Sequence, residues 1–290
     1  MRKVLQGSTV AAFMSCVLLT ACRGAAVPNQ VLAKPVPAVV ASPVPRTGGP
    51  WVYRSSVDRQ GFVVDQRAVV SIRGDTMTRT DTLESHVELA FTVAPAGNVL
   101  AGNVSVFLVG GGGRPAATPP GLAVPFPVRA EYPALDAQLI FTSPRDATPC
   151  ASLALSAAQS LRDLWFRPPD TLHTSTLWQD STSYVVCRDG LPLRATTRRT
   201  FRVSGATTNN GRTTLSISRI SRTTLEGAGA QFGEPVTVSG AGSGELNYVL
   251  DLSSGEILSA SGTSTLDLTL HGRVRSQAVR QAVEIRIGRS

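Results

Sequence analysis

Lysine is almost absent from this chain of 290 residues. Only Lys3 and Lys34 occur, and every other basic residue is an arginine. The chain after residue 34 therefore lacks the amine that a phosphate-binding loop, a kinase strand or a Schiff base requires. Charged residues are also scarce, at 17%, with 28 basic and 20 acidic side chains. This mild positive charge, without aromatics interleaved among the basic residues, argues against nucleic acid as a partner.

The sequence signatures of common catalytic and metal sites are absent too. The chain has no Gly-x-Ser-x-Gly, no His-Glu-x-x-His and no Cys-x-x-Cys. Its three histidines lie in different segments: His86, His173 and His271. Paired carboxylates serve as general acid and base, but Asp163, Asp170 and Asp180 occupy a predicted helix end and turns, which favours solvated charges. We therefore expect no enzyme, metal or cofactor, and keep a hydrolase as the less favoured alternative.

The first residues have the layout of a secretory signal. Arg2 and Lys3 precede a mostly apolar stretch over 10–19, which small residues follow. Ten apolar residues are too few to cross a bilayer as a helix, which needs about 20. We expect no transmembrane span here or later, because no later apolar run is longer than this one.

The end of this segment, Leu19-Thr20-Ala21-Cys22, resembles the lipobox of bacterial lipoproteins. The resemblance implies that Cys22 receives a diacylglycerol, that the signal is cut before it, and that the new amine gains an acyl chain such as palmitate. Three chains exceed what stable anchoring requires. Arg23, in place of the aspartate that retains such proteins at the inner membrane, implies the periplasmic side of the outer membrane. An ordinary cleaved signal with an accidental cysteine is the alternative.

A proline-rich segment follows the lipobox. Between residues 23 and 50 the chain contains Pro28, Pro35, Pro37, Pro43, Pro45 and Pro50. Such a segment is a semi-rigid tether at about 3 Å per residue, although a pro-segment packed on the domain is an alternative. The expected organisation is a signal peptide over 1–21, a lipidated cysteine and tether over 22–50, and one β-rich domain over 51–290.

Alternation of apolar and polar residues dominates the chain from Trp51 onward. Val87, Leu89, Phe91 and Val93 share one side of a segment, as expected of a half-buried strand. Further strands are predicted over 62–72, 76–83, 99–109, 139–141, 183–187, 191–203, 213–224, 246–252, 258–270 and 278–287. The Ser and Thr on the other faces suit an antiparallel sheet with one wet side. Within the strand over 191–203 the exposed face carries Arg194, Arg198 and Arg202, a stripe that suits anionic lipid headgroups.

One segment departs from this pattern. From Cys150 to Trp165, apolar residues recur at the spacing of a helix, and Pro168-Pro169 end it. The apolar stripe consists of Leu153, Ala157, Leu161 and Leu164. An amphipathic helix among strands must lay this stripe on the sheet. The predicted fold is therefore mainly β: a strongly curved antiparallel sheet, half-barrel or open barrel, with one amphipathic helix packed on its concave face.

Cys150 and Cys187 are the thiols that remain after the anchor. The compartment outside the cytoplasm is oxidising, so we expect a disulfide between them. A zinc site needs more ligands than the nearby His173 supplies, and a redox pair prefers Cys-x-x-Cys spacing.

These features favour a membrane-anchored, non-enzymatic binding module that shelters an apolar ligand or an acyl chain inside the sheet. Its partners would be the membrane, through Cys22, and a lipid or an envelope protein. We place Leu161, Trp165 and Trp178 beside the ligand, because large amphipathic rings often border apolar pockets. The alternative is a structural or assembly lipoprotein that docks an envelope protein and has a solid interior.

Overall fold

A computed structural model describes residues 48–54, 58–74, 78–95, 98–131, 138–141, 150, 153–188, 191–231, 234–273 and 276–290. The signal segment, Cys22 and nearly all of the tether lie outside the described residues. The strands are β1 (Trp51–Val52), β2 (Gln60–Arg73), β3 (Thr78–Val93), β4 (Val99–Gly111), β5 (Arg114–Ala117), β6 (Phe126–Glu131), β7 (Gln138–Phe141), β8 (Thr171–Leu172), β9 (Leu177–Arg188), β10 (Leu191–Asn209), β11 (Arg212–Gln231), β12 (Glu234–Asp251), β13 (Glu256–Gly272) and β14 (Ser276–Arg289). The helix α1 (Leu153–Ser160) continues into a 3-10 turn, η1 (Leu161–Leu164).

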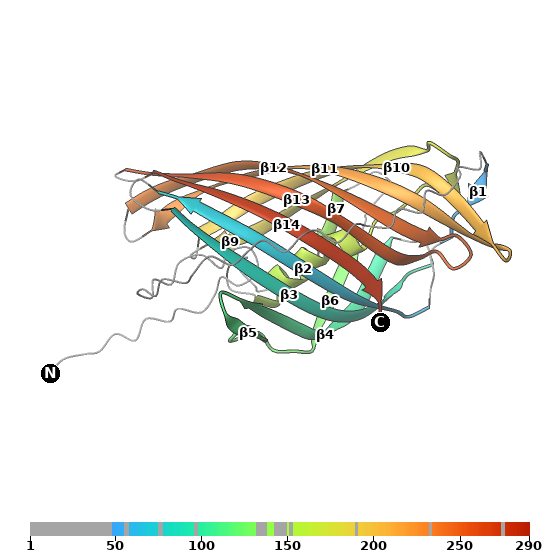
Figure 1. Cartoon of the computed structure of the whole chain (residues 1–290), viewed down its shortest axis with the longest axis horizontal. Helices are drawn as coiled ribbons and strands as arrows, with labels where there is room; N and C mark the ends of the chain where they lie inside the picture. The colour runs from blue at the N-terminus through green and yellow to red at the C-terminus, as the bar shows by residue number, and fades with distance from the viewer. Residues whose placement is uncertain are drawn as a thin grey trace, which may run out of the picture.

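Twelve strands form one large curved sheet (Figure 1). Their order is β3-β2-β14-β13-β12-β11-β10-β9-β7-β6-β4-β5, and β3 also pairs with β4. The side formed by β6, β7 and β9 is thin, because β7 joins each neighbour through only two residue pairs. The sheet is thus strongly curved but incompletely sealed. The predicted mainly β fold with a large antiparallel sheet is confirmed, and the thin side agrees with an open barrel.

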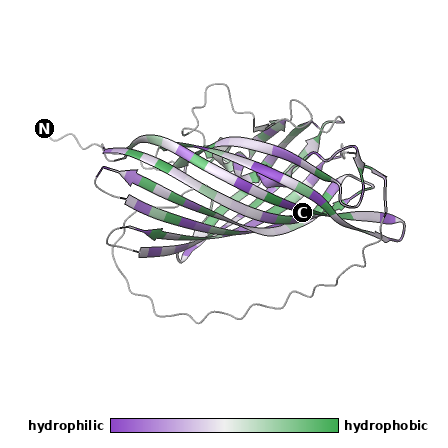
Figure 2. Cartoon of the chain, turned by 90° about the horizontal axis from the view of Figure 1, so that it is seen from above, coloured by the Kyte–Doolittle hydropathy of each residue, from purple (hydrophilic) through white to green (hydrophobic). Residues whose placement is uncertain are grey.

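The alternation read from the sequence sorts the side chains into an inner and an outer face. On β10 the odd-numbered positions from Leu193 to Val203 are buried or nearly so, whereas Arg194, Arg198 and Arg202 are exposed. Figure 2 shows the same alternation of hydrophilic and hydrophobic residues along the strands. The sheet therefore turns its apolar face inward and a polar face to the solvent. No helix in the described part of the chain has the length and apolar character that crossing a bilayer requires.

Turn residues fix the register of the longest hairpins. Asn210 and Gly211 connect β10 to β11, and both have positive φ, 49° and 77°. Two such residues form a tight turn whose twist matches that of the flanking strands. Ser253, Ser254 and Gly255 lie in the turn that connects β12 to β13, since Asp251 pairs with Glu256 across it. Register in β10 to β13 is therefore set locally.

Glycine allows neighbouring strands to approach closely where the sheet bends. A Cβ built on Gly262 of β13 would lie 2.0 Å from the carbonyl oxygen of Glu245 on β12. A Cβ on Gly242 would lie 2.4 Å from the carbonyl oxygen of Thr265. Bulges in β10, between Val203 and Gly205, and in β13, at Leu258 opposite Val249 and Leu250, add local twist. The strong curvature thus has identifiable causes in the sequence.

Two separate apolar clusters fill parts of the interior. The first lies toward the turn that connects β10 to β11. Its aromatic members are Phe62, Phe91, Phe107, Phe126, Trp165, Phe166, Trp178, Phe201 and Tyr248. The second contains Val70, Ile72, Leu191, Leu193, Ala195, Leu225, Val236, Val238, Leu268, Leu270 and Val279. The strands run through both clusters, so a middle layer of the interior belongs to neither of them.

The helix packs inside the curve of the sheet, as predicted (Figure 1). Ala157, Leu161 and Leu164 are buried in the first cluster, and Leu153 packs partly against it. The helix is shorter than the predicted span of 150–165. Its last four residues form a 3-10 turn, and Trp165 has extended backbone, three residues before the prolines.

Replacing Leu161 with alanine is expected to lower the free energy of unfolding by about 3 kcal/mol, because it leaves a cavity in a packed core. Leu161 is 5% exposed. Leu177→Ala makes the same chemical change at a side chain that is 61% exposed and is the matched control. Urea denaturation followed by tryptophan fluorescence measures both. Equal losses for the two variants would mean that α1 is not docked in the core.

Candidate functional site

A polar layer separates the two apolar clusters and is centred on the end of the helix. Inward-facing positions of β9, β10 and β11 place Asp180, Arg199 and Arg219 in this layer. The turn η1 adds Arg162 and Asp163 from inside the sheet. Five charged side chains inside a β-sheet are costly to desolvate, so each must be paired or placed at a polar cavity.

Arg199 is the most deeply buried charge. Its side chain is 0% exposed and forms a bidentate ion pair with Asp180, in which Nε and Nη2 donate to the carboxylate at 2.6 and 2.5 Å. Its Nη1 donates to the carbonyl oxygens of Arg162, at 2.8 Å, and of Trp165, at 3.3 Å. Carbonyl groups at a helix end lack partners within the helix. Arg199 thus joins the sheet to the end of η1.

Arg219 and Tyr248 complete this attachment. Arg219 pairs with the carboxylate of Asp163, and the hydroxyl of Tyr248 donates to the Asp163 carbonyl oxygen at 2.9 Å. Burial alone would raise the pKa of Asp163, but the positive charges of Arg219, Arg162 and Arg199 outweigh it and hold the pKa at about 2. Burial raises the pKa of Tyr248, so its hydroxyl remains protonated and a donor. Asp163 therefore stabilises the fold above its unfolded pKa, and this contribution is lost as pH falls toward 2.

A cavity of about 160 Å³ adjoins this polar layer. Arg162, Asp163 and Arg219 line it on one side, together with Thr197, Ser221 and Thr223. Leu193, Leu225 and Leu268 of the second cluster also line it, as do Leu266, Val283 and Ile285. Its wall is therefore partly polar and charged and partly apolar.

Partial exposure of inward-facing residues marks the same cavity on adjacent strands. Gln66 on β2, Gln281 on β14, Ser264 on β13 and Thr223 on β11 all face inward and line the cavity, yet none is fully buried. Each lies between buried residues at either end of its strand. A solid interior would bury this row completely. The partial exposure of these four residues indicates that the interior of the sheet is hollow between the two apolar clusters.

Orphaned polar atoms occur in the same layer. Among the described residues, the buried Nε of Arg219 and the buried hydroxyl of Thr182 have no hydrogen-bond partner. Buried polar groups in native proteins are nearly always satisfied by protein, water or a bound group. These two atoms indicate that the polar layer has hydrogen-bonding capacity left over.

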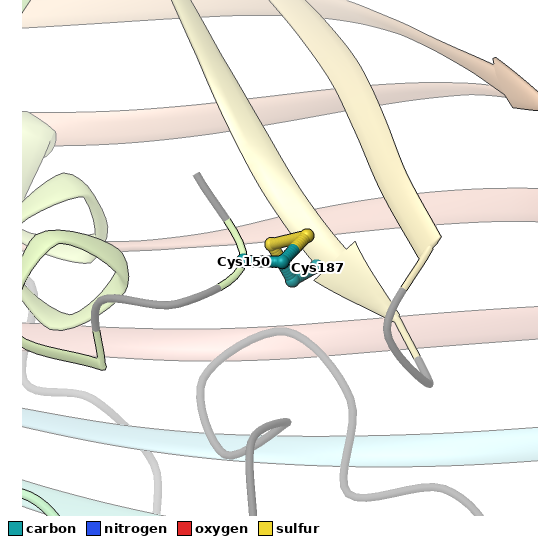
Figure 3. Close-up of a disulfide and its surroundings, with 2 residues drawn as sticks. All are labelled: Cys150 and Cys187. Carbon is teal, nitrogen blue, oxygen red and sulfur yellow. A yellow bond between two sulfur atoms is a disulfide. The ribbon is translucent and has the colours of Figure 1, made fainter. Parts of the chain in front are cut away.

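The predicted disulfide lies beside the cavity. The sulfur atoms of Cys150 and Cys187 are at bonding distance, and their Cα atoms are 5.3 Å apart. Figure 3 shows the pair at the end of β9, next to the helix. Both cysteines line the cavity, as do Leu153 and Tyr184. The bridge thus ties Cys150, which precedes α1 in the chain, to β9.

The structure places the predicted ligand-contacting residues in the first apolar cluster. Leu161, Trp165 and Trp178 are 5%, 7% and 8% exposed. Trp178 stacks on Phe201 at 5.1 Å between ring centroids. None of the three is among the residues that line the cavity, so their contact with a ligand stays a prediction.

The histidines are all on the outside of the sheet or in loops. His86 contacts the carboxylates of Asp65, at 2.8 Å, and Glu88, at 3.3 Å. His271 contacts the hydroxyl of Ser276 at 3.3 Å. Within the described segments, no histidine contacts both a hydroxyl and a carboxylate. The arrangement that would favour a hydrolase is thus not formed by these residues.

Sequence reasoning missed the buried charges. The sequence pattern predicts solvated carboxylates at Asp163 and Asp180, whereas both form ion pairs inside the sheet, and it does not point to Arg162, Arg199 or Arg219. The alternation of the strand could have revealed the burial of Arg199, because this residue shares a face with the apolar Phe201 and Val203. Arg219 likewise follows Ile217 at strand spacing.

Comparisons with known proteins give only distant matches. No protein-family model matches this chain, and no curated protein matches it either. Among solved structures, OpdQ of Pseudomonas aeruginosa is similar at 7% identity and a TM-score of 0.27, covering 80% of this chain and 99% of its own. OccK2 (OpdF) of the same organism, solved with glucuronate, has 9% identity and a TM-score of 0.22, covering 81% of this chain and 98% of its own. A DUF1329 family protein from Desulfovibrio piger has 9% identity and a TM-score of 0.15, with 76% of this chain and 83% of its own covered. TM-scores of this size do not establish a common fold.

Proposed function

We propose that this chain is an envelope lipoprotein whose folded part is a non-enzymatic binding module that shelters a ligand with an apolar portion. The hollow middle of the sheet carries this proposal. Inward-facing residues on β2, β11, β13 and β14 remain partly exposed there because they face a cavity. A structural lipoprotein would be expected to fill this space with side chains.

The size of the cavity restricts the ligand. A dry cavity of about 150 Å³ holds benzene, so about 160 Å³ accommodates roughly six to eight non-hydrogen atoms. Pockets for drug-sized ligands are larger, about 300 to 1,000 Å³. The module therefore encloses either a small molecule or one end of a longer acyl chain.

The anchor is proposed from the signal segment and the lipobox. Diacylglycerol and an amide-linked chain on Cys22 would hold the domain at the periplasmic face of the outer membrane, and residues 22–50 would serve as its tether. The polar outer face of β10 to β14 fits a domain that stands in water beside the membrane.

Replacing Cys22 with serine is expected to release the protein from the membrane fraction almost completely, because both thioether-linked and amide-linked chains require that cysteine. Sedimentation of membranes, followed by immunoblotting, measures the distribution. Cys150→Ser, which removes a cysteine outside the lipobox, is the control and should stay with the membranes. A Cys22→Ser protein that still sediments with the membranes would contradict lipid anchoring through Cys22.

Binding is tested by what the lipidated protein retains when it is purified in mild detergent. Native mass spectrometry is expected to show a bound small molecule in a fixed ratio, released on denaturation. A protein purified with no adduct, and with no affinity for any apolar probe, would instead favour the structural or assembly role.

A further inference from the structure

We propose that the cavity takes an amphipathic anion, a small carboxylate with a short apolar chain, and that Arg162 binds its carboxylate. This inference rests on the proposed binding function and specifies the chemistry of its ligand. It is carried by the charges in the polar layer, the free edge of one guanidinium, and the order of residues along two strands.

Among the described residues, the charges in the polar layer do not balance. Three arginines, Arg162, Arg199 and Arg219, face the two carboxylates of Asp163 and Asp180. Arg199 forms an ion pair with Asp180, and Arg219 forms one with Asp163. Arg162 forms no ion pair with any described residue, so one positive charge remains beside the cavity. A partly desolvated cation favours an anion nearby.

The guanidinium of Arg162 is held in place, and most of its N–H donors have no partner within the part of the chain that the structure describes. Its Nη1 donates to the carbonyl oxygen of Gln159 at 3.1 Å, and its carbon lies 4.5 Å from the ring centroid of Tyr184. A guanidinium has five N–H donors in a planar fork that fits a carboxylate bidentately. Stacking on Tyr184 fixes the plane of the fork and reduces the entropy that binding would cost.

The lining changes from polar to apolar in the same direction on two adjacent strands. On the inner face of β11, Arg219 is followed in sequence by Ser221, Thr223 and Leu225. Along β10 the lining residues are Thr197, which pairs with Thr223, and then Leu193. A ligand with a charged head and an apolar tail would match this gradient, because each part would meet its own kind of wall.

The test uses hexanoate, which has eight non-hydrogen atoms, and the neutral hexanol as probes in isothermal titration calorimetry with the full-length Cys22→Ser protein. Hexanoate is expected to bind saturably and at least tenfold more tightly than hexanol. Arg162→Gln is expected to weaken hexanoate binding at least tenfold and to leave hexanol binding unchanged. Arg202→Gln removes the same charge from the outer face of β10 and is the matched control.

The outcomes separate this inference from the proposed function. If hexanol binds as tightly as hexanoate and Arg162→Gln changes neither, the ligand is not an anion held by Arg162, while the binding module stands. If neither probe binds at millimolar concentration, the proposed binding function fails together with the inference. Unchanged thermal unfolding of Arg162→Gln would show that a lost affinity is not a folding defect; as a second variant, Arg162→Lys should recover part of the affinity, because it keeps the charge without the fork.

Discussion

Replacing Arg199 with methionine is expected to lower the free energy of unfolding by about 4 kcal/mol. The change removes the guanidinium that forms a bidentate ion pair with the buried carboxylate of Asp180. It also removes the donor that Arg162 and Trp165 use at the end of the helix. Urea denaturation followed by circular dichroism measures the loss.

Arg202→Met is the matched control for this variant. It makes the same change on the same strand, at an exposed position of the outer face. It should alter stability by less than about 0.5 kcal/mol. Asp180→Leu added to Arg199→Met should recover much of the loss, because no unpaired charge then remains buried. A loss below about 1 kcal/mol in Arg199→Met alone would mean that the ion pair is open to water.

Replacing Cys150 and Cys187 together with serine is expected to lower the free energy of unfolding by about 4 kcal/mol. The bridge joins residues 37 positions apart, and a loop of this length loses about that much closure entropy when it is cross-linked. The effect is measured by denaturation under non-reducing conditions. Reduction of the unchanged protein should produce the same loss.

A second measurement addresses the bond itself. Intact mass after alkylation of natively secreted protein should show Cys150 and Cys187 protected until a reductant is added. Two thiols that alkylate freely before reduction would contradict the disulfide. Leu177→Ala, at an exposed apolar position of β9, checks that a surface change on this strand does not itself cause a loss.

Much of the sheet could be predicted because its strands are amphipathic with a period of two. The segment over 191–203 was expected as a strand and is part of β10, with Leu193 and Val203 buried. Short or irregular strands were not predicted: β5 is wholly exposed, and β6 contains Pro127. Such segments have little periodicity and are defined by their neighbours in the sheet.

The site was harder to predict than the fold. Large rings often border pockets, which is why the sequence points to Trp165 and Trp178; both are buried in the first apolar cluster, and their contact with a ligand stays a prediction. A ring that stacks on Phe201 and one that lines a cavity have the same appearance in a sequence. The cavity depends instead on small and polar residues such as Thr223 and Ser264, which resemble any solvent-facing strand residue until the inward face is known.

The pairing of β2 with β14 has a consequence for how this domain matures. Arg73 pairs with Ala278 and Phe62 with Arg289, so two strands far apart in the chain share one ladder of hydrogen bonds. Contacts between residues so far apart in the chain form late, because the entropy of loop closure is lost before the contacts can stabilise the structure. In the export that we propose for this lipoprotein, with the amino terminus leading, β2 and β3 would emerge well before β14. The hairpins from β9 to β13 can form as they emerge, whereas one edge of β2 stays unpaired until β14 follows. The unpaired edge of β2 can form hydrogen bonds with a strand of another chain. We therefore infer that the newly exported chain most needs protection from aggregation before β14 has paired with β2.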